Sequence, residues 1–386
     1  MVKIGIIGSG LIARYHAEAI KECMADCQIW AICDIDEKKM KKYAEDMELG
    51  SVRQYTSYKE LIDSSGVDMV SVCTSNDTHK EITVYAAEKG MNLLCEKPLG
   101  LNSDEVEMMA AACEKNNVVN MTGFTYRRIP AMAMIKKMID DGSLGRIYHY
   151  RGRFYADRMA PVDHPLEWRH LEEKAGSGVL GDLASHTLDM ALYLLNHQCT
   201  EIKDVFADAS IFVPYRKDEV SGVMTKVTSD DVCNIIAHFE DGTEVVLENS
   251  RYWCCIIKVD TLFSRILRKK CKPILTISYS PFEMEIHISG EKGSIKYNLS
   301  NYDEFQLMLY ESPADYFKTF KTVKVPPEKR NNKLMPSDRM ARQYAYMTEC
   351  VEKHKMAQPA IGETIYIQKL LDVMKTSYKK GEKIYL

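Results

Sequence analysis

A lysine follows directly after an apolar segment of this 386-residue chain, in the sequence Leu94-Cys-Glu-Lys97-Pro98. The apolar run 91–95 is predicted to be a buried strand of a parallel sheet, so Lys97 is expected at the carboxyl edge of that sheet, where open α/β sheets bind ligands. An ammonium group at such an edge can hydrogen-bond a reacting oxygen and share its proton. The position alone leaves two interpretations open, a catalytic lysine and a buried ion pair between Lys97 and Glu96.

A carboxylate and an imidazole stand four residues apart at Asp182 and His186, within a helical run from Val179 to about Leu195. This spacing puts both side chains on one helix face, where they can hydrogen-bond a hydroxyl substrate and transfer a proton near neutral pH. A surface pair without catalytic consequence is equally compatible with the spacing. The glycines that precede the helix, Gly176 and Gly178 among them, predict the close approach of another chain segment or a ligand.

A glycine-rich turn follows the first predicted strand in the sequence Gly8-Ser-Gly-Leu-Ile-Ala13, which matches G-x-G-x-x-G/A. Such a turn brings backbone N–H groups and a helix N-terminus to a pyrophosphate. Asp34 ends the second strand, where an acidic side chain binds the ribose hydroxyls and repels a 2′-phosphate, which predicts NAD over NADP. The alternative is that Asp34 caps the following helix. The predicted cofactor contacts here are Gly8, Ser9, Gly10, Leu11, Ile12 and Asp34.

Small polar residues at the end of a later strand, Thr74, Ser75 and Asn76, are predicted to line the ribose and nicotinamide of the cofactor. A capped helix start is the other interpretation, and both can hold together. His79 is counted with this cofactor segment, although packing within the helix is favoured over a catalytic role.

Aromatic and arginine side chains in two further segments can wall a pocket or stack on a ring. Tyr126 and Arg127 follow the last strand of the first region, and Trp168 and Arg169 precede the glycine run. Ordinary packing between domains is the alternative. The predicted cofactor contacts include Glu96, Lys97, Trp168 and Arg169, and the predicted substrate contacts are Lys97, Tyr126, Arg127, Tyr155, Arg158, Asp182 and His186.

The predicted helices and strands that must position these residues follow one pattern in the first part of the chain and another in the rest. Over the first 122 residues, short apolar strands alternate with amphipathic helices, which is typical of βαβ units and a doubly wound parallel sheet. Strands are predicted at 2–7, 28–33, 68–73, 91–95 and 118–122, and helices near 11–24, 36–47, 78–89 and 103–116. The predicted fold class is α/β, with an N-terminal Rossmann domain over residues 1–122.

After Gly123 the pattern indicates a second domain over residues 123–386. A helix near 130–141 and a strand near 145–155 lead into an irregular segment at 156–178, and from 201 to 312 strands follow one another without helices. This pattern predicts an α+β domain with an open, mainly antiparallel sheet. Two helices, near 338–354 and 362–379, close the chain and are candidates for packing back on the first domain.

Composition excludes several classes of protein. The formal net charge is −4 and no half of the chain is strongly basic, so no nucleic-acid partner is expected. The twelve cysteines stand in apolar surroundings and are interpreted as reduced thiols of a cytoplasmic protein. No signal segment or membrane-spanning run is predicted. No metal is predicted, because the histidines fit no common metal-binding spacing.

Three motifs of this chain, taken together, resemble the Gfo/Idh/MocA family of NAD(P)-dependent oxidoreductases. In order along the chain they are the fingerprint at Gly8, the Glu96-Lys97-Pro98 motif and the Asp182-x-x-x-His186 segment. The similarity covers almost the whole chain. It implies a Rossmann domain, an open antiparallel sheet domain and an active site in the cleft between them. It also implies that Lys97, Asp182 and His186 form the catalytic set.

The resemblance has consequences for partners as well. Family members often form dimers or tetramers through the exposed face of the sheet, so a homo-oligomer is expected. The segment 254–281 is longer than the family leads one to expect between two sheet strands, and it is predicted to be an insertion.

Within the family, the run 163–169 followed by 175–178 looks most like members that act on pyranoses, glycosides or cyclitols. This implies an NAD-dependent dehydrogenase acting on CH–OH groups, which oxidises a secondary ring hydroxyl, such as a sugar C3, to a ketone. Two alternatives are an NAD-dependent glycosidase that uses transient oxidation and elimination, and a non-catalytic, nucleotide-sensing regulatory protein.

Overall fold

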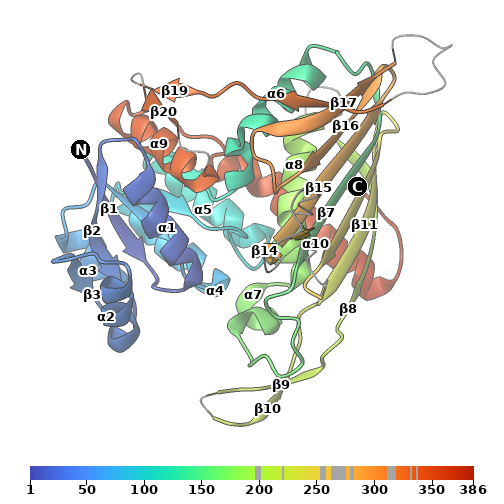
Figure 1. Ribbon diagram of the computed structural model, residues 1–386. Helices are drawn as coiled ribbons and strands as arrows, with labels where there is room; N and C mark the ends of the chain where they lie inside the picture. The colour runs from blue at the N-terminus through green and yellow to red at the C-terminus, as the bar shows by residue number, and fades with distance from the viewer. Residues whose placement is uncertain are drawn as a thin grey trace, which may run out of the picture.

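A computed structural model of the chain describes residues 1–195, 201–219, 221–252, 258–261, 275–278, 282–310, 319–330, 333–335 and 338–386. Two large sheets organise these residues, one of six strands in the first third of the chain and one of nine strands in the remainder (Figure 1). Lys97 lies just after a strand of the first sheet, and Asp182 lies in the part of the chain that packs on the second.

The first sheet is parallel throughout, with strand order β3-β2-β1-β4-β5-β6. Its strands are β1 (Val2–Ile7), β2 (Cys27–Cys33), β3 (Arg53–Tyr55), β4 (Met69–Val72), β5 (Asn92–Cys95) and β6 (Asn120–Thr122), and its helices are α1 (Leu11–Glu22), α2 (Glu37–Asp46), α3 (Tyr58–Ser64), α4 (Asn76–Glu88) and α5 (Ser103–Lys115). The strand order reverses between β1 and β4, which is where doubly wound sheets bind ligands. The predicted Rossmann architecture is confirmed.

Two elements of this sheet, β3 and α3, were not predicted. β3 is a three-residue strand at the sheet edge with largely exposed side chains, so it has no apolar run to identify it. α3 begins after Ser57, whose hydroxyl accepts from the backbone N–H of Glu60. Such a cap is a visible signal, but the helix it starts has only seven residues.

The second sheet has the order β18-β17-β16-β15-β7-β12-β11-β8-β21. Neighbouring strands are antiparallel except for β7 and β12, so the predicted mainly antiparallel sheet is confirmed. The strands are β7 (Ile147–Ala156), β8 (Ile202–Ser210), β11 (Val232–Phe239), β12 (Glu244–Ser250), β15 (Phe282–Gly290), β16 (Gly293–Asn298), β17 (Glu304–Leu309), β18 (Lys321–Lys324) and β21 (Ile384–Tyr385).

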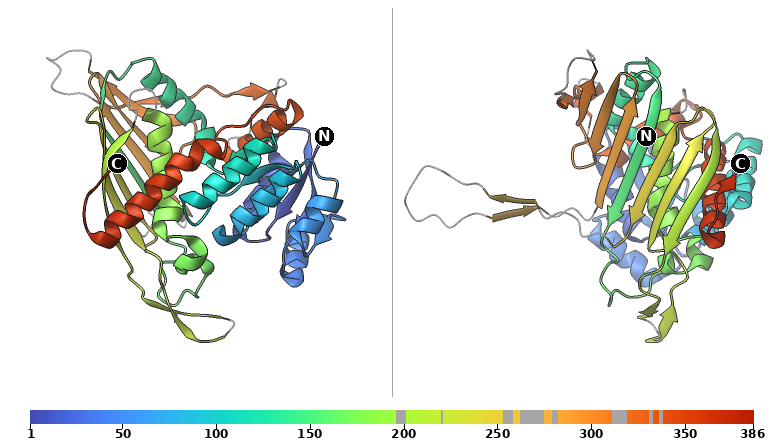
Figure 2. Two further views of the ribbon diagram at one scale, coloured as in Figure 1. Left: turned by 180° about the vertical axis from the view of Figure 1, so that it is seen from behind. Right: turned by 90° about the vertical axis from the view of Figure 1, so that its right-hand side faces the viewer.

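The two faces of the second sheet differ. Side chains alternate along each strand, so Tyr150 and Phe154 of β7 enter the core while Tyr155 points the opposite way. Helices α6 (Pro130–Asp140), α8 (Ser185–Leu195) and α10 (Ile365–Lys380) contribute to the core on the inner face. Figure 2 (right) shows the outer face of the strands turned to the viewer, with the helices behind them.

The last two helices lie between the two halves and contact both. α9 (Arg339–Glu352) places Met340, Tyr344 and Met347 in one core with residues of β1 and α1. α10 packs with the second sheet. The division of the chain into domains at Gly123 stays a prediction.

Short elements complete the described chain. They are η1 (Thr125–Arg128), η2 (Trp168–His170), α7 (Glu172–Ala175), η3 (Leu180–Ala184), η4 (Gly362–Thr364) and the strand pairs β9 (Tyr215–Lys217) with β10 (Met224–Lys226), β13 (Lys258–Thr261) with β14 (Leu275–Ser278), and β19 (Lys329–Arg330) with β20 (Lys333–Leu334). Apart from β13 and β14, the predicted insertion at 254–281 lies outside the described residues. Within the described part of the chain, no helix has the length and apolar character needed to cross a membrane.

Candidate active site

The turn after β1 has the backbone geometry that a bound pyrophosphate requires. Gly8 has φ +100°, and a Cβ there would lie 2.7 Å from the main-chain oxygen of Cys73, so only glycine fits. At Gly10, which caps α1, a Cβ would meet no atom within 4 Å. The space beside Gly10 and the helix N-terminus together fit a dinucleotide phosphate.

Asp34 stands at the end of β2, beside this turn. Its Oδ2 accepts from the backbone N–H of Ser9 at 2.8 Å and from the Ser9 hydroxyl at 2.6 Å. Burial opposes ionisation, yet these hydrogen bonds and the nearby Lys39 hold the pKa of Asp34 below its ordinary value. A fixed, ionised carboxylate at this place fits two ribose hydroxyls and repels a 2′-phosphate. It also orders the turn through Ser9.

The polar segment after β4 joins the two halves of the chain. Thr74 accepts a hydrogen bond from the Thr78 hydroxyl at 2.7 Å, and the Asn76 amide donates to the main-chain oxygen of Ala175 at 2.9 Å. His79 is fully buried, with one ring nitrogen 3.0 Å from the oxygen of Pro98 and the other 3.2 Å from that of Thr74. His79 thus lies in the core between two loops of the site and can donate a hydrogen bond to one of them.

The ammonium group of Lys97 reaches into the second half of the chain. Its Nζ donates to the main-chain oxygen of Asp182 at 2.6 Å and lies 3.0 Å from Asp182 Oδ1. The Lys97 side chain is only 11% exposed. Glu96 bonds His16 instead, with Oε1 3.0 Å from His16 Nε2. Lys97 and Glu96 therefore pair with different residues rather than with each other.

Asp182 also faces a second cation. Its Oδ2 lies 3.7 Å from Nε of Arg169, whose guanidinium lies over the ring of Trp168 at 4.2 Å. Burial opposes ionisation of Asp182, but the charges of Lys97 and Arg169 hold its pKa far below its ordinary value. Asp182 is therefore an anion at any physiological pH.

His186 lies in an aromatic surround formed by three rings. The ring centroids of Tyr126, Phe154 and Phe124 lie 4.6, 5.8 and 6.1 Å from that of His186. Within the described residues, the buried Nδ1 of His186 has no hydrogen-bond partner. Burial lowers the pKa of His186 well below its ordinary value, and the charge of Lys97 lowers it further. The imidazole is therefore neutral at pH 7.

The helix that carries Asp182 and His186 differs from the continuous α-helix that the spacing predicts. Residues 180–184 form the π-helical turn η3, which runs directly into α8. Single π turns are frequent at functional sites. The turn sets Asp182 at the entrance to the helix, where its main-chain oxygen and its carboxylate both reach Lys97.

Another chain segment holds the start of this helix. A Cβ at Gly178 would lie 1.9 Å from the main-chain oxygen of Asp230, which confirms the close approach predicted at this glycine. The Asp230 carboxylate accepts from the backbone N–H of Gly178 at 2.7 Å and of Leu180 at 2.8 Å. It thereby caps the otherwise unpaired N–H groups of the turn.

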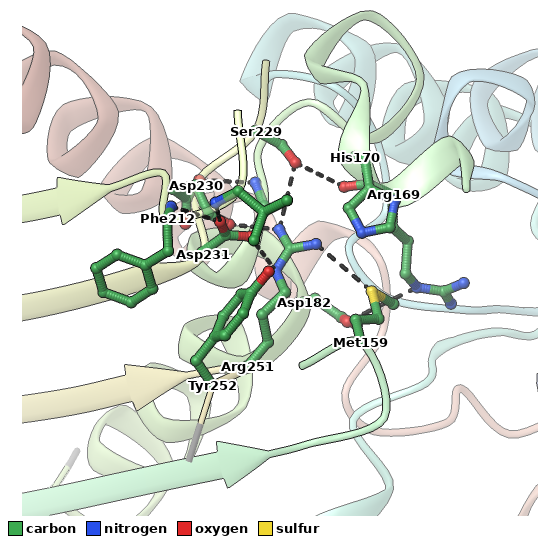
Figure 3. Close-up of polar contacts among 12 residues, drawn as sticks. Met159, Arg169, His170, Asp182, Phe212, Ser229, Asp230, Asp231, Arg251 and Tyr252 are labelled. Atoms are coloured by element: carbon green, nitrogen blue, oxygen red, sulfur yellow. Dashed lines mark hydrogen bonds and ion pairs between the residues drawn. The ribbon is translucent and has the colours of Figure 1, made fainter. Parts of the chain in front are cut away.

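Arg251 supports the same segment from behind (Figure 3). Its guanidinium is buried, bonds the main-chain oxygen of Asp230 and lies 3.3 Å from Asp231 Oδ1. Asp230 and Arg251 were not among the predicted site residues. The two adjacent aspartates before β11 were the signal in the sequence for such a cap. Their role becomes clear only from the tertiary structure, in which β11 lies against η3.

The irregular segment 156–178 carries further charge pairs. Arg158 forms a two-pronged ion pair with Glu167, at 2.5 and 3.0 Å. Burial opposes ionisation, but Arg158 and His164 lower the pKa of Glu167 to about 2. Arg216, with a side chain buried to 1% exposure, donates to the main-chain oxygens of Met159 and Pro161. These contacts give the segment a fixed course.

Two predicted substrate contacts lie elsewhere. Arg127 pairs with the buried Asp189 of α8, with Nη2 2.6 Å from Oδ1. Tyr155 lies on the outer face of the second sheet and donates to Glu248 at 3.0 Å. The alternation of side chains along β7 sends residue 155 away from the face that holds Phe154. The side chains of Arg127 and Tyr155 are thus held by Asp189 and Glu248, and their assignment as substrate contacts stays a prediction.

Five of the predicted site residues line one cavity. A cavity of about 10 Å³ is lined from one side by Asn76 and Lys97 and from the other by Trp168, Arg169, Asp182 and Arg251. It lies between the two halves of the chain. A hollow of about 610 Å³ lies apart from it on the outer face of the second sheet, with Phe206 and Ile236 in its lining.

Comparisons with known proteins agree with this geometry. Residues 2–124 match the model of the oxidoreductase family with an NAD-binding Rossmann fold, and residues 132–296 match that of the GFO/IDH/MocA C-terminal domain. Levoglucosan dehydrogenase of Pseudarthrobacter phenanthrenivorans is 30% identical over 345 residues, which cover 84% of this chain and 80% of that protein. Myo-inositol 2-dehydrogenase of Thermotoga maritima is 32% identical over 250 residues, or 65% of this chain and 69% of that protein.

A solved structure of levoglucosan dehydrogenase in complex with NADH and levoglucosan superposes with a TM-score of 0.83 at 25% identity, covering 100% of this chain and 99% of that one. The glycine turn and the carboxylate at the end of β2 are the features with which a Rossmann fold binds NAD, the cofactor that this structure contains as NADH. The chain therefore belongs to the Gfo/Idh/MocA family and is an NAD-dependent dehydrogenase.

Proposed function

We propose that the protein oxidises a secondary ring hydroxyl of an unphosphorylated sugar, glycoside or cyclitol to a ketone, at C3 where the substrate is a pyranose. The contact between Lys97 and Asp182, beside a neutral His186, is the observation that carries the proposal. NAD held at the glycine turn and Asp34 would supply the hydride acceptor, and the protein supplies orientation and charge. The names of the two relatives support a ring polyol as substrate.

His186, Lys97 and Asp182 have different roles at the reacting hydroxyl. His186 accepts the hydroxyl proton, because its imidazole is neutral at working pH. Lys97 donates a hydrogen bond to the same oxygen and stabilises the negative charge that develops as the hydride leaves. Asp182 holds the Lys97 ammonium in place and accepts a hydrogen bond from a neighbouring hydroxyl of the substrate.

The charge balance of the cleft supports an uncharged substrate. Lys97 and Arg169 face Asp182, Arg158 faces Glu167, and Arg251 faces Asp231, each within 4 Å. Three carboxylates thus serve these four cations, with Asp182 shared by Lys97 and Arg169, and a phosphate would compete with a carboxylate at each cation. Hydroxyl groups can share these charged partners without breaking an ion pair.

A substrate panel tests the proposal. Monosaccharides, anhydrosugars, glycosides, inositols and sugar phosphates are incubated with enzyme and NAD, NADH is followed by absorbance, and products are identified by mass spectrometry. We expect NADH formation with one or more neutral ring polyols and a keto product two mass units lighter than the substrate. Cleavage of a glycoside without net NADH would favour the glycosidase alternative, and turnover confined to sugar phosphates would refute the argument from charge.

Two further properties belong to the proposal. We place the protein in the cytoplasm, a proposal supported by the free thiols of its described cysteines. We also propose a homo-oligomer, dimer or tetramer, formed through the outer face of the second sheet, where Phe206 is 38% and Ile236 42% exposed. Light scattering after size-exclusion chromatography tests the second point, since Ile236→Lys should yield monomers if this face is the interface.

A further inference from the structure

Four polar side chains form a buried chain of hydrogen bonds behind Lys97. Ser71 Oγ lies 2.7 Å from Tyr344 OH, Tyr344 OH lies 2.6 Å from His16 Nδ1, and His16 Nε2 lies 3.0 Å from Glu96 Oε1. Glu96 is 6% exposed and the other three are fully buried. They come from β4, α9, α1 and the end of β5. We refer to these four residues as the His16 network.

The His16 network contains one ionised carboxylate, that of Glu96. Burial raises the pKa of Glu96, but the hydrogen bond and charge of His16 bring it below its ordinary value. An ionised carboxylate only accepts hydrogen bonds, so His16 donates from Nε2. The other oxygen, Glu96 Oε2, accepts from the backbone N–H of Lys97 at 3.3 Å. One carboxylate therefore links His16 to the backbone of the lysine.

The surrounding chain leaves Glu96 little room to move. A Cβ at Gly123 would lie 2.6 Å from Glu96 Oε1, so the connection after β6 runs directly against the carboxylate. Replacing a buried ionic group by apolar residues of similar volume is often neutral or stabilising. The presence of a buried charge next to Lys97 therefore calls for a reason other than stability.

We propose that His16 is a positioning residue for hydride transfer, which acts through Glu96 on Lys97. His16 fixes the carboxylate, the carboxylate fixes the backbone of Lys97, and Nζ is thereby aimed at Asp182 and the substrate oxygen. Tyr344 and Ser71 hold His16 in turn. His16 lies six residues after Gly10 on α1, so the helix that begins at the cofactor turn also aligns the lysine. The inference rests on the proposed function, because that function gives Lys97 its role.

Three variants and one control test the network through turnover. His16→Ala removes the link, Tyr344→Phe removes only the hydroxyl that holds His16, and His16→Gln keeps an N–H that can reach Glu96. Tyr43→Phe is the matched control, because Tyr43 is also buried and its hydroxyl donates to Ala13 of α1 at 2.8 Å, outside the network. Misplacing a reacting group by about 1 Å costs about 100-fold, so kcat should fall about 10- to 100-fold in His16→Ala and about 3- to 10-fold in Tyr344→Phe.

His16→Gln should recover most of this loss, and Tyr43→Phe should keep wild-type kcat. The Kd for NADH, measured by fluorescence, should stay near the wild-type value in all four proteins. If His16→Ala proves too unstable to purify, Tyr344→Phe against Tyr43→Phe decides the question. Equal kcat in those two variants, or a loss of NADH affinity that accounts for the lower rate, would overturn the inference.

A second measurement needs neither cofactor nor substrate. Acetic anhydride acetylates exposed lysines, and the rate at Lys97 in the apoprotein can be followed by peptide mass spectrometry. A Lys97 released from its alignment should react several-fold faster in His16→Ala and Tyr344→Phe, and at the wild-type rate in Tyr43→Phe. Unchanged acetylation in both network variants would overturn the positioning role. Faster acetylation in a protein that oxidises no ring polyol would overturn the proposed function and leave the alignment of Lys97 standing.

Discussion

Lys97 Nζ and Asp182 Oδ1 lie 3.0 Å apart, although the two residues are 85 positions apart in the chain. Lys97 follows the end of β5 in the parallel sheet, and Asp182 lies in the π turn η3 at the entrance to α8. The contact places a cation of the cofactor-binding half beside an anion of the other half. Several experimental consequences depend on it.

Replacing the lysine should remove most turnover while leaving cofactor binding in place. Loss of a group that takes part in proton transfer costs about 100- to 10,000-fold in rate, and Lys97→Met should show a fall in kcat of this size on the substrate found in the panel. The Kd for NADH should change little, because the glycine turn and Asp34 are untouched. Lys80→Met is the control, since Lys80 forms an ion pair with Glu105 that lies apart from the site. Near-normal kcat in Lys97→Met would remove the lysine from the mechanism.

The pH dependence of the free enzyme should reflect the depressed pKa of His186. A base must be unprotonated to act, so kcat/KM falls when the pH drops through its pKa. Burial and Lys97 hold the pKa of His186 well below 6.5. We therefore expect kcat/KM to stay constant from pH 8 down to 6.5 and to decline only below that. A decline centred above pH 6.5 would show that another group is the base. His186→Asn should lose about 100- to 10,000-fold in kcat.

Two glycines should respond in opposite ways to the same substitution. Gly178→Ala forces a Cβ to within 1.9 Å of the Asp230 oxygen, and overpacking of this kind costs about 1 to 3 kcal/mol. Its denaturation midpoint in urea should fall clearly. Gly10→Ala meets open space, so its midpoint should stay near that of the wild type while NADH binds more weakly, because the methyl group enters the pyrophosphate cradle. Equal midpoints for the two variants would contradict the close approach at Gly178.

Stability should decline on mild acidification because of His170. Burial, with the charges of Arg251 and Arg216, lowers the pKa of His170 from 6.5 to about 3. As the pH falls below 6.5 the unfolded chain binds a proton that the folded protein refuses, so stability is full above pH 6.5 and is lost toward pH 3. The contribution of one such group is at most about 1.4 kcal/mol per pH unit.

The variant His170→Asn isolates this effect. The asparagine oxygen can accept the hydrogen bond that Glu167 N–H donates to His170 Nδ1 at 2.9 Å, and it does not titrate. Urea denaturation between pH 7 and 5 should therefore show a smaller loss of stability in the variant than in the wild type. Parallel curves would mean that His170 is not the group responsible.

The local patterns in the sequence were sufficient for five of the six strands of the first sheet. Apolar runs alternating with amphipathic helices, a glycine turn after the first strand and Asp34 after the second are all features of short range, and they predicted the parallel sheet and NAD as the cofactor correctly. β3 and α3 were not predicted. Each is short and largely exposed, so neither has a periodic pattern of apolar residues in the sequence.

The second half of the chain was predictable in class but less so in detail. A succession of strands without helices predicted an antiparallel sheet. The face of the sheet on which each side chain lies, however, depends on the register of the strands. Tyr155 and Phe154 are neighbours in sequence and lie on opposite faces, and Arg127 turned to Asp189. A one-residue difference along a strand decides between a cleft and an outer surface.

The sequence by itself determined the cofactor turn, the place of Lys97 at the end of a strand and the spacing of Asp182 and His186, because each depends on residues within one element. Only the tertiary structure decided which of these groups meet. The pairing of Lys97 with Asp182, the pairing of Glu96 with His16 and the Asp230 cap all join segments more than 45 residues apart. Contacts of that range follow from how sheets and helices pack, and local patterns do not specify them.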